Sequence, residues 1–310
     1  MIEGQEDVTW EDWVALAQAC ERHGIEALFR SDHYLSVAGA HDRGSLDAWA
    51  TVCGLAAQTT TLRLGTLVSP ATFRHPSVLA KMATTADHIS GGRIEVGLGA
   101  GWMEAEHEMY GFPFAGLRTR MDVLAEQLEI VHRSWEPDEF SFAGEHYTID
   151  GLNAQPKPVQ QPHPPLIMGG AAGKRATALA ARWADEYNTA FATVEQARER
   201  RGIVEAACRD AGRDPLPFSL MNALVVGADR ADVERRAAEV AALMGRDGDR
   251  ATIVGEFAQQ WIVGTVDEVV ARLREYEEAG VQRVFLQHLL HRDLDVVELI
   301  GRELVPALSS

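Results

Sequence analysis

A turn leads into a short apolar run and three alternating glycines in Gly91-Gly92-Arg93-Ile94-Glu95-Val96-Gly97-Leu98-Gly99-Ala100-Gly101-Trp102. We expect a strand over residues 94–98. Glycine at every second position removes side chains from one face of the strand end, so a flat ligand can lie against the backbone there. The stretch is not a dinucleotide-binding G-x-G-x-x-G motif, because Trp102 occupies the place of its last glycine.

The same order, a strand that ends in polar or glycine residues and is followed by a helix, recurs along the chain. It is seen in at least three other segments, 27–34, 62–73 and 165–170. This alternation continues through the whole length and predicts a parallel α/β barrel. The expected strands are 27–29, 62–68, 94–98, 166–168, 185–188, 218–226 and 283–287. The expected helices are 10–23, 46–58, 76–88, 117–134, 173–183, 194–211, 230–243, 252–261, 266–279 and 294–301.

Two segments depart from the alternation. Residues 136–165 lack a helical period and contain an expected hairpin, 140–142 against 146–149, followed by a proline-rich stretch. We interpret this segment as an excursion before strand five within a single domain, 1–310. Only residues 2–5 precede the first helix, so the first barrel strand is a stub, or the chain begins later than its relatives do.

The composition is that of a soluble globular protein with a large core, because 46% of the 310 residues are hydrophobic and 24% are charged. The formal net charge is −17 and lysine and arginine do not cluster, which argues against nucleic acid and anionic membranes as partners. No window approaches about 18 consecutive apolar residues. The first residues lack a basic flank and an apolar segment, so we expect a cytoplasmic location.

No metal site is expected. Cys20, Cys53 and Cys208 are widely separated and odd in number, which indicates reduced core thiols rather than disulfide or metal partners. No arrangement of cysteine, aspartate or glutamate completes a metal site around His288 and His291. We interpret these two histidines as part of an ordinary loop after a strand.

A series of motifs has an order and spacing that together are specific, although each motif alone is common. The motifs are Phe29-Arg30-Ser31-Asp32-His33-Tyr34, Phe73-Arg74-His75-Pro76, 62–68, 90–93, 97–102, 164–170 and 184–188. The chain thereby resembles the bacterial luciferase-like monooxygenase superfamily, specifically its branch that uses the deazaflavin coenzyme F420. The resemblance runs from about Thr9 to the end and is weakest over 227–262. It implies a (β/α)8 TIM barrel with an insertion, usually a homodimer.

His33 lies near the end of strand 27–29, beside Asp32. The C-terminal ends of barrel strands carry the active site, and an imidazole exchanges protons near neutral pH, more readily beside a carboxylate. The alternative is a helix-capping aspartate with an incidental histidine. The resemblance implies that Asp32 and His33 face the flavin or deazaflavin ring and form the catalytic pair.

Two further segments are expected to contact the coenzyme ring. The resemblance implies a cis peptide bond between Leu67 and Val68 that backs the ring, whereas these residues alone indicate only a buried strand end. The second segment comprises Gly99, Ala100, Gly101 and Trp102. The indole of Trp102 either stacks over the ring or packs in the core.

The acidic residues around this segment bear on the substrate. Sugar-phosphate dehydrogenases of the superfamily have a glutamate near the place that Trp102 occupies here, and this difference argues against a sugar-phosphate substrate. Glu104, Glu106 and Glu108 follow closely, and we expect them to be solvated.

Residues 169–175 form a glycine-rich turn between a strand and a helix, and the turn ends in Lys174 and Arg175. Free amides at a helix N-terminus together with two cations make an anion site. The resemblance implies that this turn holds the coenzyme phosphate, with the Gly170 amide facing it; the alternative is a flexible turn with solvated cations. The expected binding residues are Gly169, Gly170 and Ala171. Asp185 and Asn188 are second-line polar groups or structural residues.

These expectations describe an oxidoreductase that transfers a hydride between an unknown small organic substrate and coenzyme F420, with His33 supplying or taking the proton. The first alternative is a two-component monooxygenase that uses reduced FMN and oxygen. The second is a non-catalytic flavin-binding protein, against which the Asp32-His33 pair argues. Substrate selection is assigned to the loops 35–46, 136–163 and 244–262.

Overall fold

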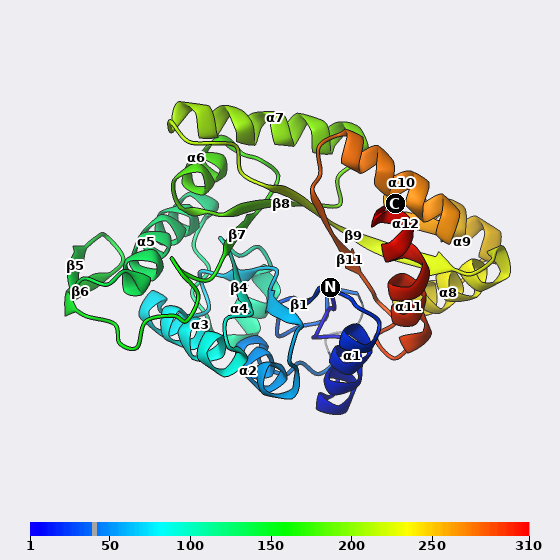
Figure 1. Cartoon of the computed structure of the whole chain (residues 1–310), viewed down its shortest axis with the longest axis horizontal. Coiled ribbons are helices and arrows are strands. Elements are labelled where there is room, and N and C mark those ends of the chain that lie inside the picture. The colour runs from blue at the N-terminus through cyan, green and yellow to red at the C-terminus, as the bar shows by residue number, and fades with distance from the viewer. Residues whose placement is uncertain (39–41, 310) are drawn as a thin grey trace.

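The computed structural model describes residues 1–38 and 42–309, so the predicted substrate loop 35–46 lies partly outside the described residues. The main sheet is parallel and is surrounded by helices (Figure 1). Its strands are, in spatial order, β1 (Ala27–Arg30), β2 (Arg63–Thr66), β4 (Ile94–Gly99), β7 (Leu166–Gly169), β8 (Glu186–Ala190), β9 (Phe218–Gly227) and β10 (Ile262–Thr265). Strand β11 (Arg283–Gln287) also pairs in parallel with β9, and the two-residue β3 (Ser69–Pro70) pairs with β4.

The first barrel strand is short, and a stub was one of the two alternatives that the sequence left open. The amide of Ile2 donates to the carbonyl of Phe29 at 2.9 Å, and the amide of Ser31 donates to the carbonyl of Ile2 at 3.1 Å. On the other side, the amide of His288 donates to the carbonyl of Met1 at 2.9 Å. The ring of hydrogen-bonded strands therefore continues from β11 through Met1 and Ile2 back to β1, which is the barrel arrangement.

The helices cover the outside of the sheet. Thr9 begins the first of them with a capping box, and Gly91 ends α3 in a left-handed conformation, φ 68°. Within residues 1–38 and 42–309, no helix has the length and apolar character needed to cross a membrane. The covering helices are α1 (Trp10–Arg22), α2 (Ala48–Gln58), α3 (Pro76–Ser90), α5 (Leu117–Trp135), α6 (Lys174–Trp183), α7 (Val194–Asp210), α8 (Arg230–Leu243), α10 (Val266–Glu278) and α11 (Leu294–Leu299), which continues through η1 (Ile300–Leu304) and α12 (Val305–Ser309).

The excursion before strand five contains the predicted hairpin. Strands β5 (Phe140–Ala143) and β6 (Thr148–Leu152) pair antiparallel and extend beyond α5 at the edge of the molecule (Figure 1). The proline-rich stretch that follows contains two cis peptide bonds, Gln155–Pro156 and Gln161–Pro162.

Strand β10 and a helix at residues 104–110 were not predicted. The expected helix 252–261 is the shorter α9 (Arg250–Phe257), after which the chain turns and enters β10 alongside the end of β9. The stretch Trp261-Ile262-Val263 is too short for its apolar pattern to separate a strand from the end of a helix. Residues 104–110 form helix α4 (Glu104–Tyr110), which Gly111 ends in a left-handed conformation.

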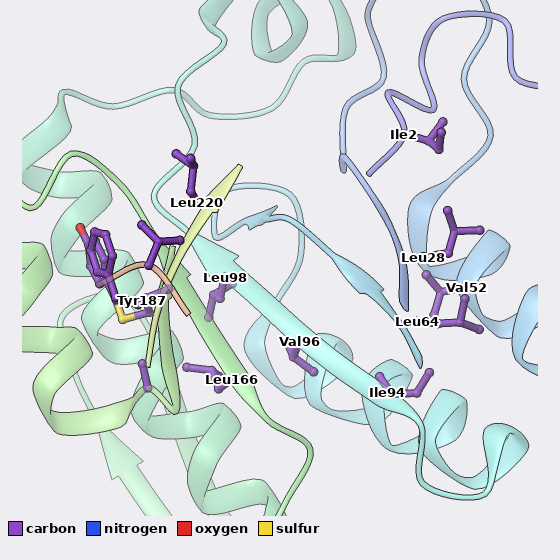
Figure 2. Close-up of a cluster of buried hydrophobic side chains, with 14 of the residues drawn as sticks. Ile2, Leu28, Val52, Leu64, Ile94, Val96, Leu98, Leu166, Tyr187 and Leu220 are labelled. Atoms are coloured by element: carbon purple, nitrogen blue, oxygen red, sulfur yellow. The ribbon is translucent and has the colours of Figure 1, made fainter. Parts of the chain in front are cut away.

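The core joins neighbouring strands to the helices that cover them. In Figure 2 the buried side chains of Leu28, Leu64 and Ile94, from β1, β2 and β4, lie close to Val52 of α2. Removing a side chain of this size from water contributes about 1.5–3 kcal/mol. This packing fixes the strands beside one another, so their C-terminal ends meet at one end of the barrel.

Candidate active site

A cavity of about 960 Å³ opens at the C-terminal ends of the strands. Its size is within the range of small-molecule sites, about 300–1,000 Å³. Of the predicted site residues, Asp32 is absent from its lining in the described structure. The predicted residues that line it are His33, Leu67, Val68, Gly99, Ala100, Gly101, Trp102, Gly169, Gly170 and Ala171.

His33 is paired with Glu106 of α4. The Nδ1 atom of His33 lies 2.8 Å from Oε1 of Glu106, and the other carboxylate oxygen accepts the amide of Tyr34 at 2.9 Å. The side chain of Glu106 is only 1% exposed. The prediction of a solvated Glu106 was wrong, because the turn of α4 directs this residue inward while Glu104 and Glu108 remain exposed.

The pairing sets the protonation of His33. Burial alone lowers the pKa of this imidazole, but the hydrogen bond and charge of Glu106 outweigh burial, and the pKa is raised above its ordinary value. Since Nδ1 faces Glu106, Nε2 is the nitrogen available to a ligand in the cavity.

Asp32 does not accept the hydrogen bond of His33, although its charge adds to that of Glu106 in raising the pKa of the imidazole, and its predicted catalytic role stays a prediction. Asp32 is buried, and its Oδ2 atom accepts hydrogen bonds at 2.6 Å from both Ser69 and Arg74. The guanidinium of Arg74 also donates to Asp47 at 2.7 Å. Asp32 therefore ties the end of β1 to the segment after β2. It holds the backbone that carries His33.

The alternating glycines make room for Val68 rather than presenting bare backbone to the cavity at every position. A Cβ atom on Gly97 would lie 2.0 Å from the carbonyl oxygen of Thr66 and 2.9 Å from Cγ1 of Val68. A Cβ atom on Gly99 would lie 2.8 Å from Cγ2 of Val68, and one on Gly169 would lie 3.5 Å from Cγ1. Val68 thus fits against three glycines and forms a wall of the cavity.

The peptide bond between Leu67 and Val68 is cis, as the resemblance implied. Trp102 is 65% exposed, so the alternative of a core tryptophan is wrong. Its ring lies edge-on to His33, with 5.4 Å between ring centroids. Both Trp102 and His33 line the cavity, one at its rim and the other inside.

The turn before α6 differs from the expectation in one respect. The amide of Gly170 donates to the carbonyl of Asn188 at 3.0 Å, so it does not face a ligand phosphate. The amide of Ala172 donates to the hydroxyl of Tyr187 at 3.0 Å. The amides available to an anion are instead those of the first turn of α6, residues 174–176, all of which line the cavity.

The polar groups near this turn have separate tasks. The side chain of Arg175 donates to the carboxylate of Asp122, whereas Lys174 is exposed at the cavity. Asp185 accepts the amide of Leu166 at 2.7 Å, at the start of β7, and is therefore structural. Asn188 lines the cavity and donates to Ser219 at 2.9 Å.

A family model described as luciferase-like monooxygenase matches residues 2–283. The chain belongs to this family. Among luciferase-like relatives, the F420-dependent glucose-6-phosphate dehydrogenase of Nakamurella multipartita is 28% identical over 320 residues, 94% of this chain and 91% of the relative. The FMNH(2)-dependent dimethylsulfone monooxygenase of Pseudomonas putida is 31% identical over 180 residues, 58% of this chain and 48% of the relative.

The fold is shared with solved structures of luciferase-like enzymes. The structure of coenzyme F420 dependent tetrahydromethanopterin reductase from Methanopyrus kandleri superposes with a TM-score of 0.81 and 20% identity, covering 99% of this chain and 97% of that one. The predicted family and barrel are therefore confirmed. The relatives named above include proteins dependent on F420 and on FMNH(2), so the family leaves the cofactor open.

Proposed function

We propose that this luciferase-like chain is an oxidoreductase that transfers a hydride between a small organic substrate and coenzyme F420. The observation that carries the proposal is the buried His33–Glu106 pair on the wall of a cavity that also contains the start of α6. The pair provides a proton-exchanging group, and the helix start provides an anion site. The similarity to the F420-dependent glucose-6-phosphate dehydrogenase supports this choice of coenzyme.

The protein's part in the reaction is to position the reactants and exchange a proton. Coenzyme F420, when bound, supplies the ring carbon that accepts or donates the hydride. Val68 provides an apolar surface for the ring, and Nε2 of His33 gives or takes the substrate proton. Glu106 stabilises the imidazolium and fixes which ring nitrogen faces the cavity. The exposed indole of Trp102 covers the ring from the rim.

The coenzyme phosphate is assigned to the first turn of α6. Its N-cap residue is Gly173, which has no side chain to satisfy the helix amides, and no contact fills the position of its missing Cβ atom. Free amides and the positive end of the helix dipole attract an anion there. Lys174 adds a full charge at the same place.

This assignment predicts that one amide can be removed without disturbing the helix. Lys174 is the first residue of α6, where proline is tolerated, and Gly173 already has the extended conformation that precedes proline, φ −63° and ψ 144°. We expect Lys174→Ala, which removes the charged side chain and keeps the backbone amide, to weaken F420 binding moderately. Lys174→Pro, which also removes the amide, weakens it about tenfold further.

The control is a deazaflavin fragment of the coenzyme that ends before the phosphate. Fluorescence titration should show that neither substitution changes its affinity. Equal weakening of the fragment and the whole coenzyme, or no difference between the two variants, would place the phosphate elsewhere.

A further inference from the structure

The cavity contains a second buried carboxylate, Glu3, at the side where the strand ring passes through Met1 and Ile2. Glu3 is 6% exposed and lines the cavity. One of its oxygens accepts the side-chain amide of Gln5 at 2.6 Å, and the other accepts the side-chain amide of Gln287. Both donors are uncharged side-chain amides. Among residues 1–38 and 42–309, no lysine, arginine or histidine side chain forms a direct ion pair with Glu3, although the charges of Arg30 and His33 act on it at longer range.

The hydrogen bonds around Glu3 orient its neighbours so that they donate to its carboxylate. Ser31 donates to the amide oxygen of Gln5 at 2.5 Å, which directs the NH₂ group of Gln5 toward Glu3. Each carboxylate oxygen has a further lone pair, because a carboxylate accepts about four hydrogen bonds. The carboxylate is largely removed from water, so a ligand that donates a hydrogen bond to one of these lone pairs gains more than it would in water.

The cavity therefore has ends of opposite charge. Strand β7, which leads to α6 and Lys174, is reached from Ile2 through β1, β2 and β4 in one direction and through β11, β9 and β8 in the other. The start of α6 thus lies across the barrel from Glu3. The α6 side attracts an anion, whereas the other side carries Glu3 and Glu106, of which Glu106 is paired with His33.

We propose that Glu3 selects the substrate: the substrate carries an amine or hydroxyl group that donates a hydrogen bond to this carboxylate, and anionic substrates are rejected. This inference rests on the proposed function, because a bound compound is a substrate only if the chain is the proposed enzyme. The preference for donor groups over anions belongs to the Glu3 side of the cavity and does not require the coenzyme, provided that the anion site at α6 is occupied.

Two probes of equal chain length test the preference, hexylammonium and hexanoate, each titrated calorimetrically into the protein with and without coenzyme F420, in a phosphate buffer whose anion occupies the start of α6 when the coenzyme is absent. We expect hexylammonium to bind at least tenfold more tightly than hexanoate. Glu3→Gln, which keeps the shape and removes the charge, should reduce this ratio at least tenfold. Glu104→Gln removes one negative charge from an exposed position outside the cavity lining and should leave the ratio unchanged.

A purely structural role for Glu3, joining the first strand to β11 through Gln287, would lower thermal stability in Glu3→Gln without changing the ratio. Glu3→Asp keeps the charge, so it should retain the preference for hexylammonium even if stability falls. Equal binding of the two probes by the native protein, no binding of either, or an unchanged ratio in Glu3→Gln would overturn the proposal. Since coenzyme affinity is measured separately, a failure to bind F420 would contradict only the proposed function.

Discussion

We expect His33→Ala to lower turnover by about 10²–10⁴-fold while the affinity for coenzyme F420 changes by less than about twofold. In the proposed function the side chain supplies the proton-exchanging nitrogen, whereas the phosphate and the ring of the coenzyme are assigned to other residues of the cavity. The measurement uses the compound that the native protein turns over fastest in a panel of small alcohols, amines and carbonyl compounds. Native turnover in the variant would make His33 a packing residue.

Glu106→Gln removes the negative charge beside His33 and nearly preserves the size and shape of the side chain. The pKa of His33 is raised by Glu106 against the effect of burial, so without the carboxylate burial remains and the pKa falls. In the direction in which His33 donates a proton, activity is present below this pKa and is lost as the pH rises through it. The variant should therefore lose activity at a lower pH than the native protein. The stability that the protonated pair contributes is likewise greatest at low pH and is lost as the pH rises through the raised pKa. An unchanged pH profile would contradict the assignment.

The largest effect on stability is expected for Gly97→Ala. The new methyl group would lie 2.0 Å from the carbonyl oxygen of Thr66, a backbone atom of β2 that cannot move without separating the strands. It would also displace Val68 from its place against the glycines. We expect a loss of about 3 kcal/mol in the free energy of unfolding, measured by urea denaturation.

Gly202→Ala is the matched control. Gly202 lies within α7, and a Cβ atom added there meets nothing within 4 Å. Because alanine restricts the unfolded chain and favours the helix, this variant should gain about 0.5–1 kcal/mol. If both variants changed stability by the same amount, the close approach of β2 and β4 at Gly97 would not be the cause.

The barrel was predictable because its signals are local and repeated. Each apolar run followed by glycine or polar residues marked a strand end, and helix caps such as Thr9 and Gly91 marked the helices. The failures lie where a short segment depends on its tertiary neighbours. β10 exists because the end of β9 offers it a partner, and its four residues alone do not distinguish a strand from a helix.

The site was predictable at strand ends and less so in the segments between them. Asp32 precedes His33 in the sequence, yet successive residues point in different directions, and the carboxylate that reaches the imidazole comes from α4. Glu106 would have been found by reading residues 104–110 as a helix, on which it adjoins the buried His107. Glu3 carried no signal, because its burial depends on Gln287, 284 residues away.

The choice of coenzyme is tested most directly by titrating the purified protein with coenzyme F420 and with FMN side by side, following the fluorescence of each. The similarity to an F420-dependent relative predicts that F420 binds at least about tenfold more tightly, whereas the cavity and the proposed anion site at α6 would accept the phosphate of either compound. Equal or tighter binding of FMN would contradict the account and favour a flavin monooxygenase.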